Sequence, residues 1–478
     1  MDNIIKKFLH SPILNSWFNA FVGLFSSIVA IPIVITKLSV EEINLWFLFA
    51  SIIALSQGVQ FGFNTTFTRF ISYVYGGVKI EEFKHLRFKK TLQYDERMNK
   101  EEFSKVFSLM KYVYIFLSFI YVIILLLVGY FALLKPIAEL SIQSDGWISA
   151  FIILFATTLK LSLGYYQNFM LGINKVALVQ RITGVVNLFG LTLILAVLFF
   201  VPTLVWIIFI YQFVALVSLL VIIYFAKQEL RHLNLSTKRS RFDKELFLIV
   251  WESAWKSGIT TIIANVVKHI SAILVAQWFP SNISASFLFT KRVFDILERF
   301  TMTTFQARVP LIARYRSQGD FIKLIPLLKQ TQYISYGVYF IGYLFLLIFG
   351  ESVLYFINSN VHLGSYILVI LFSFATFLSR WGGMTLSISN QSNHVVEHTN
   401  AIIVSIIFFS IIFLYYKSFG VYVFPFAQLV ALIVVTPLIS RVVYKNIHTT
   451  FWEYESKVFL PFLGLLMIVN IIYYWSSI

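Results

Sequence analysis

The sequence has no cysteine and few charged residues. None of its 478 residues is Cys, and Asp, Glu, Lys and Arg together make up 13% of the chain. The absence of Cys excludes disulfides, thiolate metal sites and a cysteine nucleophile, and it leaves the redox compartment open. There is also no glycine-rich phosphate loop, no G-x-G-x-x-G, no G-x-S-x-G and no D-x-D motif of metal-dependent glycosyltransferases. We therefore expect no cofactor.

Acidic residues are scarcer than basic ones, and apolar residues dominate. The chain has 22 Asp and Glu against 38 Lys and Arg, 59% hydrophobic residues and a mean hydropathy of +0.81. Apolar runs of about 20 residues, long enough to cross a hydrocarbon layer about 30 Å thick, recur along the whole chain. The sequence therefore predicts an all-α integral membrane protein embedded in the lipid bilayer, with no separate soluble domain.

The basic residues are distributed by side of the membrane, so we expect no nucleic-acid partner. The N-terminal segment lacks a cleavable signal pattern and is interpreted as the start of the first helix. If it is cytoplasmic, alternate connections place 25 Lys and Arg inside and three outside, as the positive-inside rule requires. The predicted spans are 12–36, 41–68, 106–134, 147–171, 176–200, 204–226, 249–279, 283–305, 331–350, 362–389, 396–416, 419–440 and 458–475.

The spans form two sets of six around a basic connection. A gapless shift of 240 residues superposes the span, loop, span pattern of 12–68 on that of 252–308, which indicates two pseudosymmetric halves. The predicted organisation is an N-terminal six-helix lobe, a basic cytoplasmic linker, a C-terminal six-helix lobe, and a basic loop followed by an extra helix. Their respective ranges are 1–226, 227–246, 247–440 and 441–478.

The strongest candidate site lies in the eighth span, in the stretch FLFTKRVFDILERF. At about 100° per residue, its five charged side chains fall within an arc of about 120°, and apolar side chains fill the opposite side. Charges at membrane depth are costly, so this face is expected to point inward. Asp295 is spaced i, i+4 from both Lys291 and Arg299 and can pair with either. Three bases exceed two acids, which leaves a cation for an anionic ligand. The five residues are Lys291, Arg292, Asp295, Glu298 and Arg299.

Other charged residues within the spans are further candidates. A single buried Lys or Arg is more often the partner of a carboxylate, as for Lys256 one turn after Glu252, or an anchor at a helix end, as for Arg308. The acids Asp295, Glu298 and Glu252 are candidates for ion coupling or for pairing with these bases. The additional cations proposed to line a cavity are Lys160, Lys256, Lys268, Arg308 and Arg380.

One pattern points to different chemistry. His394, Glu397 and His398 spell H-x-x-E-H, the inverted zinc-protease signature, with Glu453 and Glu455 downstream as possible third ligands. A three-residue pattern of this kind arises easily by chance, and two solvated His at a helix start explain it equally well. We therefore predict no metal site.

The runs SSIVAIPIVITKLSVEEINLWFLFASIIALSQGVQFGFNTTFTRFIS, AILVAQWFPSNISASFLFTKRVFDIL and YQNFMLGINKVALVQRITGVVNLF carry a family resemblance. They resemble Wzx-type polysaccharide and O-antigen flippases of the multidrug/oligosaccharidyl-lipid/polysaccharide (MOP) exporter superfamily. The resemblance covers residues 12–440 and implies two six-helix lobes of the MATE type, about 12 to 13 transmembrane helices in all, and alternating access.

The resemblance also implies a function. It predicts translocation of an undecaprenyl-diphosphate-linked oligosaccharide, the repeat unit of O-antigen or another surface glycan, across the bacterial inner membrane, with cationic cavity residues facing the diphosphate. Polysaccharide polymerase machinery would be a partner, and the protein itself would not be an enzyme. Lys268 and His269 stand where the family often has an acid, so an ion-coupling carboxylate is not carried over. The alternatives are a cation-coupled drug antiporter of the same fold and a membrane enzyme acting on polyprenyl-linked glycans.

Overall fold

A computed structural model describes residues 11–60, 62–77, 100–235, 242–306, 308–317, 320–389 and 397–477, and within these ranges it contains helices and no strands. Contacts group the chain into two compact units. The first unit comprises residues 1–38 and 48–270, and the second comprises 39–47 and 271–478.

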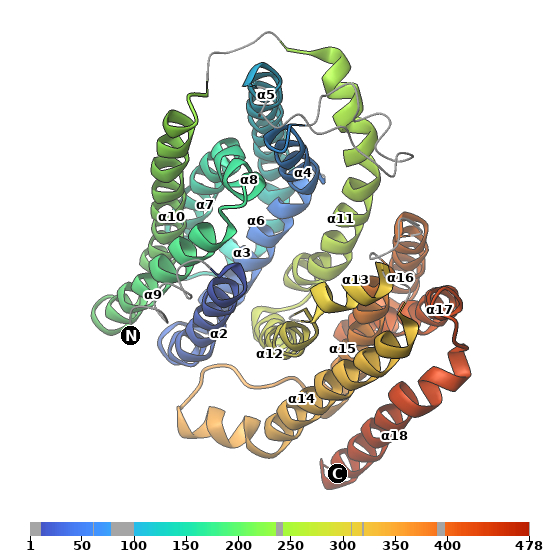
Figure 1. Ribbon diagram of the computed structural model, residues 1–478. Coiled ribbons are helices and arrows are strands. Elements are labelled where there is room, and N and C mark those ends of the chain that lie inside the picture. Colours follow the sequence, from blue (N-terminus) through green and yellow to red (C-terminus); the bar gives the residue numbers. More distant parts are fainter. Residues whose placement is uncertain are drawn as a thin grey trace, which may run out of the picture. The chain divides into compact units, whose positions relative to one another are not determined.

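The first unit contains most of the helices in the first half of the chain (Figure 1). Their bounds are α2 Pro12–Lys37, α3 Val40–Val59, α4 Phe63–Tyr75, α5 Lys100–Ile124, a π-helical turn Leu125–Gly129, α6 Tyr130–Ala138, α7 Gln143–Leu163, α8 Tyr165–Gly172, α9 Val176–Phe200, α10 Leu204–His232 and α11 Lys244–Trp278. The first eight residues of α3 and the last eight of α11 belong to the second unit.

The second unit contains the remaining helices. Their bounds are α12 Ser281–Gln306, α13 Val309–Ser317, α14 Phe321–Phe356, α15 Tyr366–Ser389, α16 Glu397–Phe419, a 3-10 turn Gly420–Tyr422, α17 Val423–Lys445 and α18 Phe451–Ser477. The thirteenth predicted span therefore forms a helix, α18. Exposed Trp452 and Trp475 lie near its two ends, as expected for side chains at the two membrane interfaces.

Local sequence explains where several helices begin and break. Ser11 caps α2 by accepting a hydrogen bond from the Leu14 amide at 3.2 Å, and Pro12 occupies the first helical turn, where no amide donor is needed. The span predicted over 41–68 is divided into α3 and α4. Gly62 adopts a left-handed backbone conformation, with φ at 68°, just before α4, and this conformation interrupts a helix.

Ten helices or continuous helical runs of the described residues are long and apolar enough to cross a membrane. Large apolar side chains stay exposed on their outer faces, for example Phe116 and Phe119 on α5 and Ile468 and Ile472 on α18. Because such faces are stable only against lipid, the chain is a multi-pass membrane protein.

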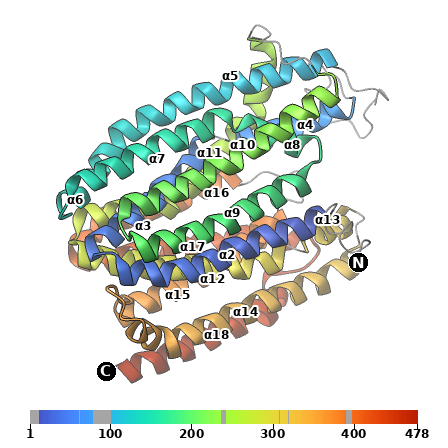
Figure 2. The same ribbon diagram turned by 90° about the vertical axis from the view of Figure 1, so that its left-hand side faces the viewer.

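Aromatic packing forms the interior of each unit. In the first unit, Phe67, Phe103 and Phe169 are fully buried between α4, α5 and α8, while α2 lies beside α9 (Figures 1 and 2). In the second unit, the Trp381 ring of α15 stacks on Phe459 of α18 with centroids 4.2 Å apart. Helix α18 is therefore part of the folded core of its unit.

The first part of α11 packs on helices that precede it in the chain. Leu246, Val250 and Ala254 join the core formed by α4, α5, α8 and α10, and Trp251 contacts the ring of Phe63 with centroids 6.1 Å apart. Contacts thus divide the chain within α11, whereas the sequence predicts a lobe boundary at 227–246. The physical reason is that these apolar side chains of α11 are buried against the first unit. The assignment of 1–226 and 247–440 to functional lobes stays a prediction.

Candidate functional site

Helix α12 presents the charged face and is held firmly inside the second unit. Phe287 and Phe294, 1% and 2% exposed, pack against Phe372 of α15 with centroids 5.3 and 5.8 Å apart. At the start of the helix, the Ser281 hydroxyl accepts a hydrogen bond from the side-chain Nδ2 of Asn44 at 3.1 Å, and the Ser284 hydroxyl donates to the Val275 carbonyl at 3.0 Å. The packed side of the helix therefore has a fixed orientation, and so does the charged arc beside it.

Two of the five charges on this face form an ion pair. The Lys291 ammonium lies 2.8 Å from Oδ2 of Asp295, and the two side chains are only 13% and 18% exposed. This is the i, i+4 pair that the sequence predicts on one helix face. The pairing neutralises one cation with one acid, and the other three charged residues of the face are Arg292, Glu298 and Arg299.

Glu298 faces the contact between α12 and α15. Its Oε1 accepts a hydrogen bond from the Ser379 hydroxyl at 2.9 Å, and it lies within electrostatic reach of the neighbouring Arg380. Arg380 is 2% exposed and donates from Nη1 to Sδ of Met302 at 2.8 Å. Among the described residues, its Nε and Nη2 have no hydrogen-bond partner. Glu298 and Arg380 are both candidates predicted from the sequence, and the structure brings them together across two helices.

Arg292 and Arg299 occupy the other edge of the arc. Arg292 is half-buried and Arg299 is exposed. On a helical projection Arg292 lies roughly 160° and Arg299 roughly 140° from buried Phe294, on the side that does not pack against α15. Because Asp295 is engaged with Lys291 and Glu298 lies beside Arg380, the open edge of this face has positive charge. An anion approaching this edge meets guanidinium groups, which bind phosphate and carboxylate oxygens in bidentate geometry.

Lys160 in α7 is the clearest candidate in the first unit. It lies within about 40° of buried Ser149, Ile153 and Ala156 on a helical projection and opposite the exposed Phe151. Its side chain is nevertheless exposed. Lys160 thus lies on the packed side of α7 rather than on its outer apolar face, and its role in lining a cavity stays a prediction.

The remaining candidates are more dispersed. Lys268 is half-buried and Glu252 is exposed on α11 in the first unit, and the Lys256 side chain lies outside the described residues. Arg308 donates from Nη1 to Oε1 of Gln330 at 3.0 Å and to Oγ1 of Thr331 at 3.4 Å. These bonds join Arg308 to α14, as expected for the anchoring alternative.

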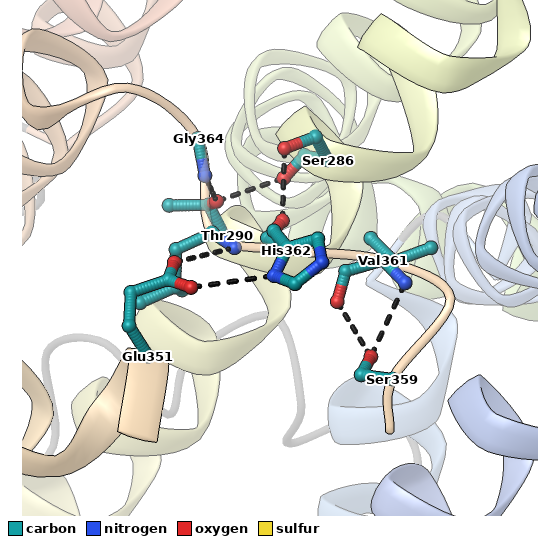
Figure 3. A network of polar contacts seen from close by, with 8 residues as sticks. Ser286, Thr290, Glu351, Ser359, Val361, His362 and Gly364 are labelled. Atoms are coloured by element: carbon teal, nitrogen blue, oxygen red, sulfur yellow. Dashed lines mark hydrogen bonds and ion pairs between the residues drawn. The ribbon is translucent and has the colours of Figure 1, made fainter. Parts of the chain in front are cut away.

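A network at one end of α12 was not found from the sequence (Figure 3). The Gly364 amide donates to Oγ1 of Thr290 at 2.7 Å, and the Ser286 hydroxyl donates to the His362 carbonyl at 2.8 Å. Glu351 at the end of α14 accepts from the Leu363 amide at 3.1 Å and lies 3.3 Å from Nδ1 of His362. The network ties the α14–α15 loop to the helix that has the charged face.

The second unexpected feature is a buried acid in α18. Glu455 is 0% exposed, and its Oε1 accepts hydrogen bonds from Nε1 of Trp381 at 2.6 Å and from the Tyr444 hydroxyl. From the sequence, Glu455 was a candidate only for a third zinc ligand, and its burial in the core was not predicted. His394 and the side chains of Glu397 and His398 lie outside the described part of the chain, and among the described residues no group of His, Asp and Glu could hold a metal ion.

No protein-family model and no curated protein sequence matches the chain. Solved structures match it over most of their length. An inward-facing multidrug resistance MATE family transporter of the MOP superfamily aligns with a TM-score of 0.62 at 14% identity, over 90% of this chain and 96% of that one. An outward-facing conformation aligns with a TM-score of 0.57 at 14% identity, over 92% and 97%.

A third solved structure is a MOP superfamily transporter from Pyrococcus furiosus, whose title states that a binding pocket of reverse polarity suggests a different function. It aligns with a TM-score of 0.55 at 13% identity, over 92% of this chain and 97% of that one. Identities this low establish the fold alone. The predicted fold class is thus confirmed: the chain has the all-helical fold seen in MATE family transporters of the MOP superfamily.

Proposed function

We propose that the protein is a Wzx-type flippase that moves an undecaprenyl-diphosphate-linked oligosaccharide across the bacterial inner membrane, with its N-terminus in the cytoplasm. The observation that supports this most directly is the surplus of positive charge on the open edge of α12. Lys291 and Asp295 neutralise each other, whereas Arg299 is exposed. A diphosphate is the anionic group of such a cargo, and guanidinium groups suit its oxygens.

The fold and the energetics are compatible with this cargo. Related folds are known in inward-facing and outward-facing conformations, as alternating access requires. The membrane potential contributes roughly 2.3 kcal/mol per elementary charge per 100 mV, so an interior-negative potential favours outward movement of an anion. No nucleotide site is needed for that step. Polysaccharide polymerase machinery would receive the translocated glycan.

A cation-coupled drug antiporter is the second candidate function. It is favoured by the two acids on the same face of α12, because cationic drugs and coupling ions bind at carboxylates. Solved structures of similar fold include multidrug resistance transporters. Against it, one of these acids is already paired with Lys291, and bases outnumber acids on this face. The net positive charge on the charged face of α12 thus favours an anionic cargo.

A reconstituted assay separates the two functions. Purified protein in liposomes would be given a fluorescent undecaprenyl-diphosphate glycan, and translocation would be followed by loss of accessibility to an added quencher. We expect Arg299→Gln to slow translocation about tenfold, because one unit charge about 10 Å away at an effective dielectric constant of about 20 is worth about 1.7 kcal/mol. Lys417→Gln, which removes one exposed cation from the end of α16, is the matched control.

Each outcome has a direct meaning. Equal rates for Arg299→Gln and wild type would refute the role of this face in binding the diphosphate. Transport of cationic drugs, with no translocation of the glycan lipid, would establish the antiporter instead.

A further inference from the structure

A cluster of cations surrounds the beginning of α18. The Lys329 ammonium lies over the Tyr454 ring at 5.4 Å from its centroid, and the Arg441 guanidinium lies over the Phe451 ring at 5.8 Å. Lys457 follows Tyr454 by three residues, so it lies on the same side of α18. We call Lys329, Arg441 and Lys457 the α18 basic cluster. Its members come from α14, α17 and α18, all within the second unit.

Packing between these helices holds the cluster together. The Tyr333 hydroxyl of α14 donates to the Lys457 carbonyl at 2.8 Å, and the rings of Tyr444 and Tyr454 stack with centroids 4.6 Å apart. Figure 1 shows α14 and α18 running side by side. The backbone positions of the three cations are therefore fixed by the fold, even though Arg441 and Lys457 are exposed.

The cluster lacks acidic partners in the part of the chain that the structure describes. No carboxylate lies within 4.0 Å of any of the three cations. Glu453 is four residues before Lys457, yet its Oε2 accepts from the Thr449 hydroxyl at 3.5 Å at the start of the helix. Glu455 is buried among Trp381 and Tyr444. Among the described residues, therefore, none of the three positive charges forms a salt bridge.

The span boundaries predicted from the sequence place the three cations at one boundary of the membrane. Lys329 is two residues before the predicted span 331–350, Arg441 is one residue after 419–440, and Lys457 is one residue before 458–475. Exposed Trp452, 64% accessible, lies close by on α18, and Trp is enriched at the level of lipid headgroups. We therefore expect the hydrocarbon layer to end near these three cations and the phosphate layer to begin there.

We propose that the α18 basic cluster binds the headgroup phosphate of an acidic phospholipid of the bilayer, such as phosphatidylglycerol. The ligand is a lipid rather than an acidic protein because the cations lie at the hydrocarbon boundary, where a phosphate has acyl chains directly beneath it. Basic pockets between transmembrane helices bind acidic lipids in this way. Helix α18 creates the site by supplying Lys457 and the two rings under Lys329 and Arg441.

The test is thermal unfolding of the full-length protein in detergent as lipid is added. We expect phosphatidylglycerol to raise the Tm more than phosphatidylcholine does. A triple variant, Lys329→Gln, Arg441→Gln and Lys457→Gln, should bind phosphatidylglycerol on the order of a hundredfold more weakly, because each Lys or Arg near an anionic surface contributes about fivefold. The matched control removes three exposed cations from the first unit by Lys227→Gln, Arg231→Gln and Lys244→Gln, and it should respond as wild type does.

Several results would overturn the proposal. These are an unchanged lipid response in the triple variant, an equal loss in the control variant, an equal gain of Tm from phosphatidylcholine, or the same gain from inorganic phosphate alone. If the triple variant does not fold, the charge-conserving variant Lys329→Arg, Arg441→Lys and Lys457→Arg decides. It should keep the selective response to phosphatidylglycerol, and loss of that response would refute the site.

Discussion

The ion pair between Lys291 and Asp295 gives the sharpest prediction about the charged face of α12. Its N–O distance is 2.8 Å, and the two side chains are 13% and 18% exposed. Exposed pairs contribute about 0.2 to 1 kcal/mol, whereas removing one partner of a buried pair costs about 3 to 5 kcal/mol. We therefore expect a coupling energy of about 1 to 3 kcal/mol for this partly buried pair, between those two limits.

A double-mutant cycle measures this coupling. The variants are Lys291→Met, Asp295→Asn and the double change, and each is unfolded by denaturant in detergent micelles. The free energies of unfolding lost in the two single variants should add up to more than the loss in the double variant, because each single change leaves one charge without its partner. The same four proteins enter the glycan-lipid translocation assay.

Translocation should follow the net charge of the face. Lys291→Met leaves the Asp295 carboxylate without its partner, so the net positive charge of the face is cancelled, and translocation should slow about tenfold by the same Coulomb argument that applies to Arg299. The double variant restores the surplus and should translocate at nearly the wild-type rate. A coupling energy near zero would refute the ion pair. A double variant as slow as Lys291→Met would show that Lys291 itself contacts the cargo.

Two further predictions concern stability. Gly172→Ala should destabilise the first unit by about 1 to 3 kcal/mol in denaturant unfolding, because its new methyl group would lie 2.5 Å from Ile71, whereas Gly23→Ala, with no atom within 4 Å, should be neutral or slightly stabilising. The hydrogen bond from the Lys323 ammonium, followed by that from the Lys323 amide, holds the pKa of Asp320 below its ordinary value. The stability from this contact is therefore present above about pH 4 and is lost as pH falls through the lowered folded-state pKa. In Asp320→Asn, the part of the Tm decrease at acidic pH that comes from protonation of Asp320 should be absent. A pH profile of Tm identical to that of the wild type would contradict the prediction.

The sequence by itself determined the helical membrane architecture. Long apolar runs predicted the spans because only a helix satisfies its backbone groups within a bilayer. The i, i+4 spacing also predicted the pairing of Lys291 with Asp295, since both lie on one face of one helix. These are local properties, set by periodicity along the chain.

Only the tertiary structure decided which groups meet across helices. The hydrogen bond of Ser379 to Glu298, the burial of Glu455 between Trp381 and Tyr444, and the packing of the first part of α11 with the first unit all depend on neighbours far away in the chain. The sequence gives the period of each helix but not its rotation or its partners. The rotation and the partners of a helix depend on the simultaneous packing of many side chains. A single acid within an apolar run therefore has the same sequence pattern whether the fold buries it or exposes it.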